Sequence, residues 1–328
     1  FVLLVILIER NLSKPKKHNM KILGIGNAII DVICKVDDKF ISANNLTKGN
    51  MKLTFDENEF KKLLSNLNIE KTISGGSVAN SIVGLSQLGN KVGFIGKISD
   101  DDFGQKYEAG LKDEKVEYIY KKKKESLPTG TCLILITPDS ERTMFTFLGT
   151  AGKINDQDVS ISAIKNSEMT FLEGYLWDEG EPKKAFDKAI ENSNKVAMTL
   201  SDKFCVDRHK KHFLELVKYK LDITFSNEEE IMSLINAKDF SEVVTFAKEI
   251  NKFLVITRGE KGAISINGDV VTEIGAKENL NIIDLTGAGD LFACGYLHGY
   301  LKNLSQNECL EKGTEMSSKI IQQIGARI

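Results

Sequence analysis

Proline, tryptophan and paired cysteines are scarce in this sequence of 328 residues. Four prolines leave little room for long disordered linkers, and the five cysteines form no Cys-x-x-Cys motif. An odd number of scattered cysteines predicts free thiols in a reducing cytoplasm rather than a disulfide framework, so we expect a cytoplasmic protein. The formal net charge of −2 gives no overall attraction to nucleic acid or to an anionic membrane.

Long hydrophobic runs are also lacking. Residues 1–8 are apolar, but a bilayer-spanning helix takes about 20 apolar residues. No basic segment precedes this run and no small-residue cleavage site follows it, so it does not fit a secretory signal. Because Met20 directly precedes the first strand pattern, we expect residues 1–19 to be a non-native or disordered extension, with an interfacial anchor as the alternative. Residues 20–328 are then expected to form one domain.

Strand and helix patterns alternate along most of the chain, with the clearest succession after residue 154. Such alternation predicts a parallel sheet covered by helices on both faces, with ligands at the carboxyl ends of the strands. Residues 31–55 favour short strands joined by turns, and residues 56–70 favour a helix that Asp56 would cap. Residues 116–147 differ, because their pattern is strand, turn, strand, turn, strand, which indicates an antiparallel patch inside an α/β chain.

The segment Asp284-Leu-Thr-Gly-Ala-Gly-Asp290 is the strongest candidate for chemistry. Gly287 and Gly289 flank Ala288 directly before an apolar helix, so backbone N–H groups can point outward at a helix N-terminus and form an anion hole. Asp290, at the start of that helix, is placed to accept a proton from a hydroxyl in line with a bound phosphate. We therefore predict that Asp290 is a catalytic base; the alternative is a capped helix after a tight turn.

Two further turns carry residues suited to a polyol. Gly75-Gly76-Ser77 leads into a helix in which Asn80 could hydrogen-bond a sugar hydroxyl. The segment Gly24-Ile-Gly-Asn27-Ala-Ile-Ile-Asp31 lacks the third glycine of a dinucleotide fingerprint, which disfavours an NAD-linked oxidoreductase. Its Asp31 could bridge two vicinal ribose hydroxyls. Plain strand–helix and turn roles remain the alternatives.

Weaker signals follow two later strands. The carboxylates of residues 227–230 could hold Mg²⁺ through water, although an acidic helix start explains them equally well. Residues 257–262 have the form of a loop that contacts a nucleotide. No Gly-x-x-x-x-Gly-Lys-Ser/Thr and no His-Glu-x-x-His motif occurs, and the aromatics do not alternate with basic residues. The sequence therefore does not predict a P-loop enzyme, a zincin or a nucleic-acid-binding protein.

In the order and spacing of four motifs, the chain resembles the PfkB, or ribokinase-like, carbohydrate and nucleoside kinases from about residue 20 to residue 327. The motifs are Gly75-Gly76 with Asn80, Asn227-x-x-Glu230, Thr257-x-Gly259-x-x-Gly262, and Asp284-x-Thr286-Gly287-Ala288-Gly289-Asp290. The resemblance implies a three-layer α/β/α sandwich with a small β-sheet lid, whose strands would come from about 31–54 and 116–147.

The resemblance also implies roles for single residues, with ATP and Mg²⁺ as cofactors. Asp290 would be the base beside an anion hole at Gly287, Ala288 and Gly289, and Asn227 and Glu230 would organise Mg²⁺ and phosphate. The implied ATP-site residues are Thr257, Gly259, Gly262, Asp284 and Thr286, and the implied lid contact to the transferred phosphate is Arg142.

The acceptor is implied less directly. Ribokinases typically carry Lys where this chain has Ser77, and fructokinases carry Gly-Glu where it has Gly26-Asn27. The combination is most similar to adenosine kinases and their bacterial relatives, in which Asp31 and Asn80 would hold the ribose and present its 5′-hydroxyl. Gly75, Gly76, Ser77, Asn27 and Arg142 would complete the acceptor side. The candidates for stacking on a base are Phe40, Phe145, Phe147 and Trp177.

We thus expect phosphorylation of adenosine to AMP. The alternatives are a sugar kinase acting on ribose, fructose or a keto-sugar acid, and a nucleotide- or sugar-binding protein that has lost catalysis. The expected partner is a small molecule, without nucleic acid or membrane, and the chain is expected to act as a monomer or as a homodimer formed through the lid.

Overall fold

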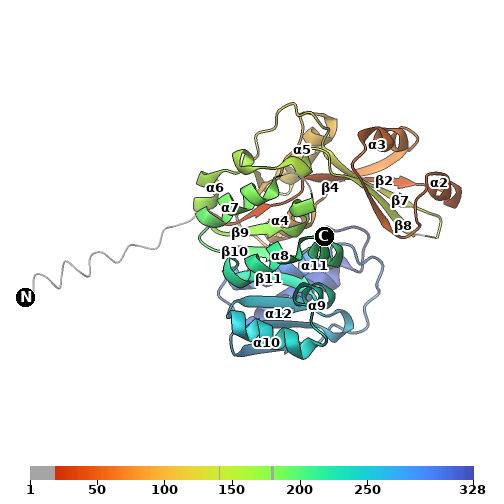
Figure 1. Ribbon diagram of the computed structural model, residues 1–328. Helices are drawn as coiled ribbons and strands as arrows, with labels where there is room; N and C mark the ends of the chain where they lie inside the picture. The colour runs from red at the N-terminus through yellow and green to blue at the C-terminus, as the bar shows by residue number, and fades with distance from the viewer. Residues whose placement is uncertain (1–18, 140, 179–180) are drawn as a thin grey trace, which may run out of the picture.

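The computed structural model describes residues 19–139, 141–178 and 181–328. These residues form two sheets, a large one in the body of the molecule and a small one that projects from it (Figure 1). The N-terminal extension expected over residues 1–19 lies outside the described residues except for Asn19. None of the described helices is long and apolar enough to cross a membrane.

The large sheet has nine strands within the described residues. In spatial order they are β14 (Val270–Ile274), β13 (Ala263–Asn267), β12 (Phe253–Thr257), β11 (Ile223–Asn227), β10 (Val196–Thr199), β9 (Ser167–Glu173), β1 (Met20–Ile25), β5 (Val92–Ile95) and β6 (Glu117–Tyr118). The run from β12 to β6 is parallel, whereas β13 and β14 pair antiparallel at one edge. The carboxyl ends of the parallel strands therefore meet along one side of the molecule, as the alternation in the sequence predicts.

Helices cover both faces of this sheet and bury two hydrophobic cores. The helices of the body are α4 (Ser77–Gln87), α5 (Asp102–Asp113), α6 (Ile161–Lys165), α7 (Pro182–Asn192), α8 (Lys203–Tyr219), α9 (Glu228–Ile235), α10 (Phe240–Ile250), α11 (Ala288–Leu301) and α12 (Gln306–Ile320), whereas α2 (Asp38–Ala43) and α3 (Glu57–Leu64) lie beside the small sheet. One core lies between the sheet and α4, α11 and α12, and the other lies between the sheet and α6 to α10.

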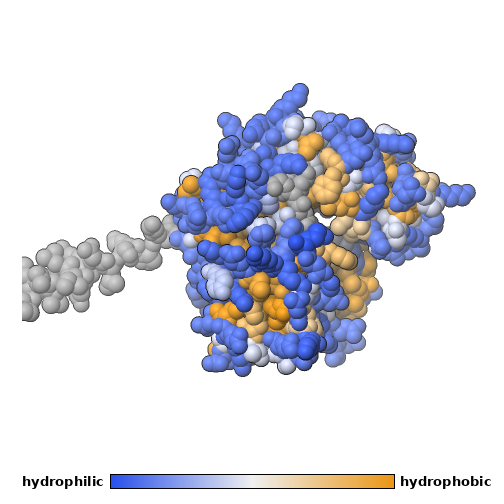
Figure 2. Space-filling view, in the orientation of Figure 1, coloured by the Kyte–Doolittle hydropathy of each residue, from blue (hydrophilic) through white to orange (hydrophobic). Residues whose placement is uncertain are grey.

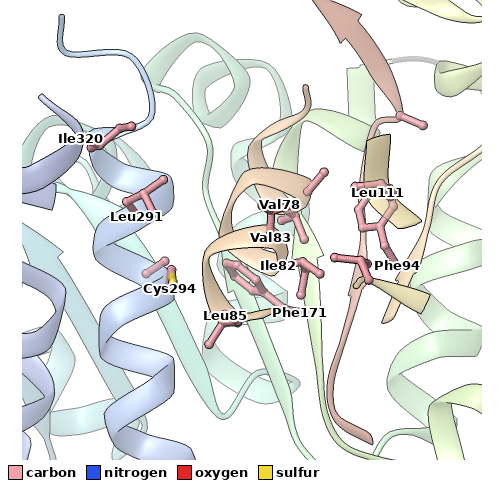
Figure 3. Close-up of a cluster of buried hydrophobic side chains, with 14 of the residues drawn as sticks. Val78, Ile82, Val83, Leu85, Phe94, Leu111, Phe171, Leu291, Cys294 and Ile320 are labelled. Atoms are coloured by element: carbon pink, nitrogen blue, oxygen red, sulfur yellow. The ribbon is translucent and has the colours of Figure 1, made fainter. Parts of the chain in front are cut away.

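The packing of α4 against α11 sets the position of the site. Figure 3 shows Leu291 and Cys294 of α11 on the side that faces α4, and these residues share one hydrophobic core with Leu85 of α4. A Cβ on Gly84 would lie 2.7 Å from the Cys294 Sγ, so the glycine permits this close approach. The N-termini of both helices are thereby held together at the carboxyl side of the sheet.

The small sheet forms the predicted lid. Its strands, in spatial order, are β3 (Met51–Thr54), β8 (Arg142–Phe147), β7 (Gly130–Ile136), β2 (Ile29–Lys35) and β4 (Ile69–Ser74). The lid lies at one end of the molecule together with α2 and α3, and the surface narrows where it joins the body (Figures 1 and 2).

The lid also contains the main differences from the sequence-based expectations. β4 lies outside the predicted lid ranges, whereas β6, which lies inside the range 116–147, belongs to the large sheet. Residues 38–43 are a helix and not a strand, because the Asp37 side chain accepts the N–H of Phe40 at 2.7 Å and begins a helical turn. By contrast, Asp56 caps α3 as expected, and its side chain accepts the N–H groups of Asn58 and Glu59.

Candidate active site

The candidate active site lies where the N-termini of α4 and α11 meet the carboxyl ends of β1, β9, β11 and β12. Gly287 is the N-cap of α11 and has a positive φ of 80°. A Cβ at this position would lie 2.7 Å from the Cα of Ala326, so both the backbone conformation and the space require glycine. Asp290 follows in the first turn of α11, as the motif predicts.

Asp290 is held by side chains from α4. Ser77 Oγ donates to Asp290 Oδ1 at 2.6 Å, and Asn80 Nδ2 donates to Oδ2 at 3.0 Å. Burial raises the pKa of Asp290 to about 6, while the hydrogen bonds from Asn80 and Ser77 and the charge of Arg327 oppose that rise. The carboxylate is therefore mostly ionised at pH 7, and a pKa near neutrality suits a general base.

The turn before Asp290 presents N–H groups. The Ala288 N–H donates to the Leu285 carbonyl at 3.2 Å, and the Leu291 N–H donates to the Gly287 carbonyl at 2.9 Å. For the N–H groups of Gly289 and Asp290, the structure gives no backbone acceptor among the described residues. These two donors stand at the positive end of the α11 dipole, so the turn suits an anion.

The residues predicted to hold the acceptor lie beside Asp290. Asp31, on β2 of the lid, has a pKa of about 7, raised mainly by burial and also by the charge of Asp290. A Cβ on Gly75 would lie 2.5 Å from Asp31 Oδ2, and a Cβ on Gly76 would lie 2.2 Å from the Asn27 carbonyl oxygen. The glycine pair thus permits β2 and the end of β1 to approach α4 closely.

Glu173 was not predicted as a site residue, yet it connects the parts of the acceptor side. It ends β9, is 1% exposed, and accepts hydrogen bonds from the Asn27 backbone N–H at 3.3 Å, from Asn27 Nδ2 at 3.0 Å and from the Val78 N–H at 3.0 Å. Burial raises the pKa of Glu173 to about 7. In the sequence, the only available signal was an acidic residue at the carboxyl end of a buried strand.

Two adjoining cavities lie on the other side of Asp290. The smaller has a volume of about 260 Å³ and is lined by Ser77, Asn227, Glu230, Thr257 and residues 287–290, among others. The larger has a volume of about 380 Å³ and extends from Gly289 past Thr257, Gly259 and Gly262 to α12. The structure thus brings most of the predicted nucleotide-side residues to one continuous hollow.

Asp284, Thr286 and Arg142 do not line these two cavities. Instead, Arg142 Nη1 of the lid lies 2.6 Å from Asp284 Oδ2, and the same oxygen accepts the Gly325 N–H at 2.8 Å. The other oxygen, Asp284 Oδ1, accepts the N–H and the hydroxyl of Thr286 at 3.0 and 2.7 Å. These residues therefore form a cluster that connects the lid to the turn before Asp290.

Glu230 is bound to Asn227 in a reciprocal cap. Asn227 Nδ2 donates to Glu230 Oε1 at 2.7 Å, and the Asn227 N–H donates to Oε2 at 3.0 Å. Burial raises the pKa of Glu230 to about 7. Over the part of the chain that the structure describes, no group of three or more His, Cys, Asp or Glu side chains could hold a metal ion.

The four aromatic candidates for stacking on a base do not line either cavity. Phe145 and Phe147 are buried in the lid core, where the Phe147 ring stacks on Phe60 with 5.2 Å between centroids. Trp177 stacks on His212 with 5.2 Å between centroids. Phe40 packs against the core from α2.

A three-layer sandwich with a β lid and a glycine turn at a helix start, beneath that lid, defines the ribokinase-like class of kinases. Within that class, the chain belongs to the pfkB family of carbohydrate kinases, whose model matches residues 22–328.

Individual relatives include both nucleoside and sugar kinases. The chain is 26% identical to adenosine kinase 2 of Arabidopsis thaliana, over 96% of this chain and 97% of that protein. Among solved structures, adenosine kinase from Sinorhizobium meliloti is 34% identical with a TM-score of 0.85, over 94% of this chain and 96% of that one. A probable sugar kinase from Rhizobium etli is also 34% identical, with a TM-score of 0.84, over 94% and 95% of the two chains.

Proposed function

We propose that this chain transfers the γ-phosphoryl group of ATP to the primary hydroxyl of a nucleoside, converting adenosine to AMP. The observation that carries the proposal is the position of Asp290, which lines the smaller cavity beside the glycine turn and is hydrogen-bonded to the polyol-binding candidate Asn80. Adenosine kinases that align with nearly the whole chain support the choice of acceptor.

The nucleotide side has the features that ATP needs. The N–H groups of Gly289 and Asp290 would face the transferred phosphate, and the larger cavity has room beside Gly259 and Gly262 for the rest of the nucleotide. ATP supplies the phosphoryl group. Mg²⁺ usually keeps several waters and binds one or two carboxylates together with phosphates, so Glu230, which lines the smaller cavity, would hold it through water.

On the acceptor side, Asp31 and Asn80 would bind vicinal hydroxyls and leave the primary hydroxyl facing Asp290. Asp290 would remove the hydroxyl proton as the hydroxyl oxygen bonds to the γ-phosphorus of ATP and the bond from that phosphorus to the bridging oxygen breaks, which releases ADP. Ser77 and Asn80 orient its carboxylate, and the turn N–H groups stabilise the developing charge. The lid, held to the core through Arg142 and Asp284, would exclude water and prevent wasteful hydrolysis of ATP.

A sugar kinase is the second candidate, and one observation favours it. None of the four aromatic candidates lines a cavity of the site, so a stacking surface for a purine is not evident among them. Asp31 and Asn80 would bind the hydroxyls of a free furanose equally well, and the Rhizobium etli relative carries the name of a sugar kinase.

An ADP-release assay separates these candidates. The full chain, with ATP and Mg²⁺, is assayed with adenosine, guanosine, cytidine, ribose, fructose and a keto-sugar acid. Adenosine should give the highest kcat/KM, with AMP as product. Rapid turnover of a sugar and none of adenosine would exclude the nucleoside function, while ligand-dependent stabilisation without any ADP would indicate a binding protein.

A further inference from the structure

Arg327 reaches the acceptor side from a part of the chain that none of the predicted motifs includes. After α12, the Gly325 N–H donates to Asp284 Oδ2 at 2.8 Å, and Ala326 packs on the turn at Gly287. Figure 1 shows this end of the chain beside α11 and beneath the lid. The contacts on both preceding residues fix the segment and direct Arg327 toward α4.

The Arg327 side chain fixes the orientation of the Asn80 side-chain amide. Arg327 Nε donates to Asn80 Oδ1 at 3.0 Å, while Asn80 Nδ2 donates to Asp290 Oδ2 at 3.0 Å. A guanidinium group can only donate and an ionised carboxylate can only accept, so these two partners leave the Asn80 amide a single orientation. Asn80 is 6% exposed, so water has little access to replace either partner.

The guanidinium also retains a donor without a partner. Arg327 Nη2 is buried and has no hydrogen-bond acceptor, and the structure gives Arg327 no ion pair with any described carboxylate. A buried polar group without a partner is costly, and charged groups cost more than neutral ones. A hydroxyl or other oxygen of a bound acceptor would satisfy this donor, in the region where Asp31 and Asn80 converge.

We propose that Arg327 is a positioning residue of the acceptor site: it orients the Asn80 amide toward Asp290 and donates through Nη2 to an oxygen of the acceptor. This inference rests on the proposed phosphotransfer to a hydroxyl. Arg327 belongs to none of the four motifs on which the sequence-based prediction of the site depends.

The charge of Arg327 adds an effect on titration. It lowers the pKa of both Asp31 and Asp290, against the larger effect of burial. Ser77 and Asn80 of α4 donate hydrogen bonds to Asp290. The other groups that interact electrostatically with it are Asp31 of the lid, Glu173 at the end of β9, Tyr175 just after that strand, and Arg327. Arg327 is the cation among the causes of the Asp290 shift, so its loss should move the acidic limb of the pH profile to higher pH.

The test compares Arg327→Gln and Arg327→Lys with wild type and with Lys302→Gln, which removes one exposed positive charge elsewhere. With the best acceptor of the panel, Arg327→Gln should lower kcat/KM for that acceptor about 10- to 100-fold, the effect of a lost charged hydrogen bond, and leave KM for ATP unchanged. The acidic limb of the pH profile of this variant should move to higher pH. Arg327→Lys keeps the positive charge but lacks the planar set of guanidinium donors. It should therefore restore the acidic limb of the pH profile but not the KM for the acceptor.

The proposal would be overturned if Arg327→Gln, at a thermal stability equal to that of Lys302→Gln, kept the acceptor kinetics of wild type. The acidic limb of its pH profile would also have to be unchanged. An equal loss for ATP and for the acceptor would also overturn it, because it would indicate a purely structural role. Failure of the proposed function is a separate result, since wild type would then turn over no acceptor. In that case a crystal structure of Arg327→Gln decides, because the proposal requires that the Asn80 amide no longer donates to Asp290.

Discussion

The two sides of Asp290 are built differently. On the nucleotide side, two adjoining cavities of about 260 and 380 Å³ open around backbone N–H groups and glycines. On the acceptor side, Asp31, Asn80, Glu173 and Arg327 crowd together, and three of the carboxyls near α4 have pKa values raised by burial to about 6 or 7. In the proposed function, the phosphate would therefore be recognised mainly by main-chain groups, whereas the acceptor would be recognised by a buried network of side chains.

Replacing Asp290 should produce the largest effect and separate the two sides. Asp290→Asn keeps the size and both acceptor-side neighbours but cannot take a proton, so kcat should fall by about 10²- to 10⁴-fold. Stabilisation of the protein by ATP in a thermal shift assay should persist, because the N–H groups of the turn remain. Near-native activity in this variant would exclude Asp290 as the base.

Asn80→Ala should impair the use of the acceptor and leave the binding of ATP unchanged. The change removes one hydrogen bond to Asp290 and the partner of Arg327 Nε, so we expect kcat/KM for the acceptor to fall about 10- to 100-fold. Steady-state kinetics with each substrate varied in turn measure this, with Lys302→Gln, an exposed substitution on the far end of α11, as the control. An effect on the ATP KM of equal size would contradict the division between the two sides.

The change of kcat/KM with pH should be the smallest of these effects near neutrality and should become steep at lower pH. Asp290 must be ionised to act, and its pKa is raised to about 6 from an ordinary value near 4, so activity should be lost at a higher pH than for an exposed aspartate. Asp31, with a pKa of about 7, is coupled to it, so kcat/KM should fall through an apparent pKa between these values and then about tenfold per pH unit. A flat profile down to pH 5 would contradict the buried-network description.

The same contrast explains how far the sequence could predict the site. The nucleotide side depends on glycines at special backbone positions and on helix N-termini, and these are visible as local motifs, such as Gly287 to Asp290. The position of Asp290 at the start of α11, the glycine pair and most strand and helix positions followed from such patterns. Local spacing carries this information because the chemistry and the backbone conformation lie within a few residues of each other.

The acceptor side depends on contacts between distant segments. Glu173 and Arg327 reach α4 across 95 and 247 residues of sequence, respectively, and neither belongs to a motif that a single sequence reveals. The ion pair between Arg142 and Asp284 likewise appears only when the lid is folded onto the core. Strand β4 was missed for a related reason, since it is a largely exposed edge strand whose pairing with β2 outweighs its weak local pattern.

The central claim, that the network around Asp31, Asn80 and Asp290 presents a nucleoside hydroxyl, has one direct test. The full chain is incubated with ATP, Mg²⁺ and adenosine in competition with an equal concentration of a keto-sugar acid, and the phosphorylated products are identified by ³¹P NMR. The proposed function predicts that 5′-AMP is the main phosphorylated product and that ADP forms with it. A phosphorylated sugar acid formed while adenosine remains unchanged would contradict it.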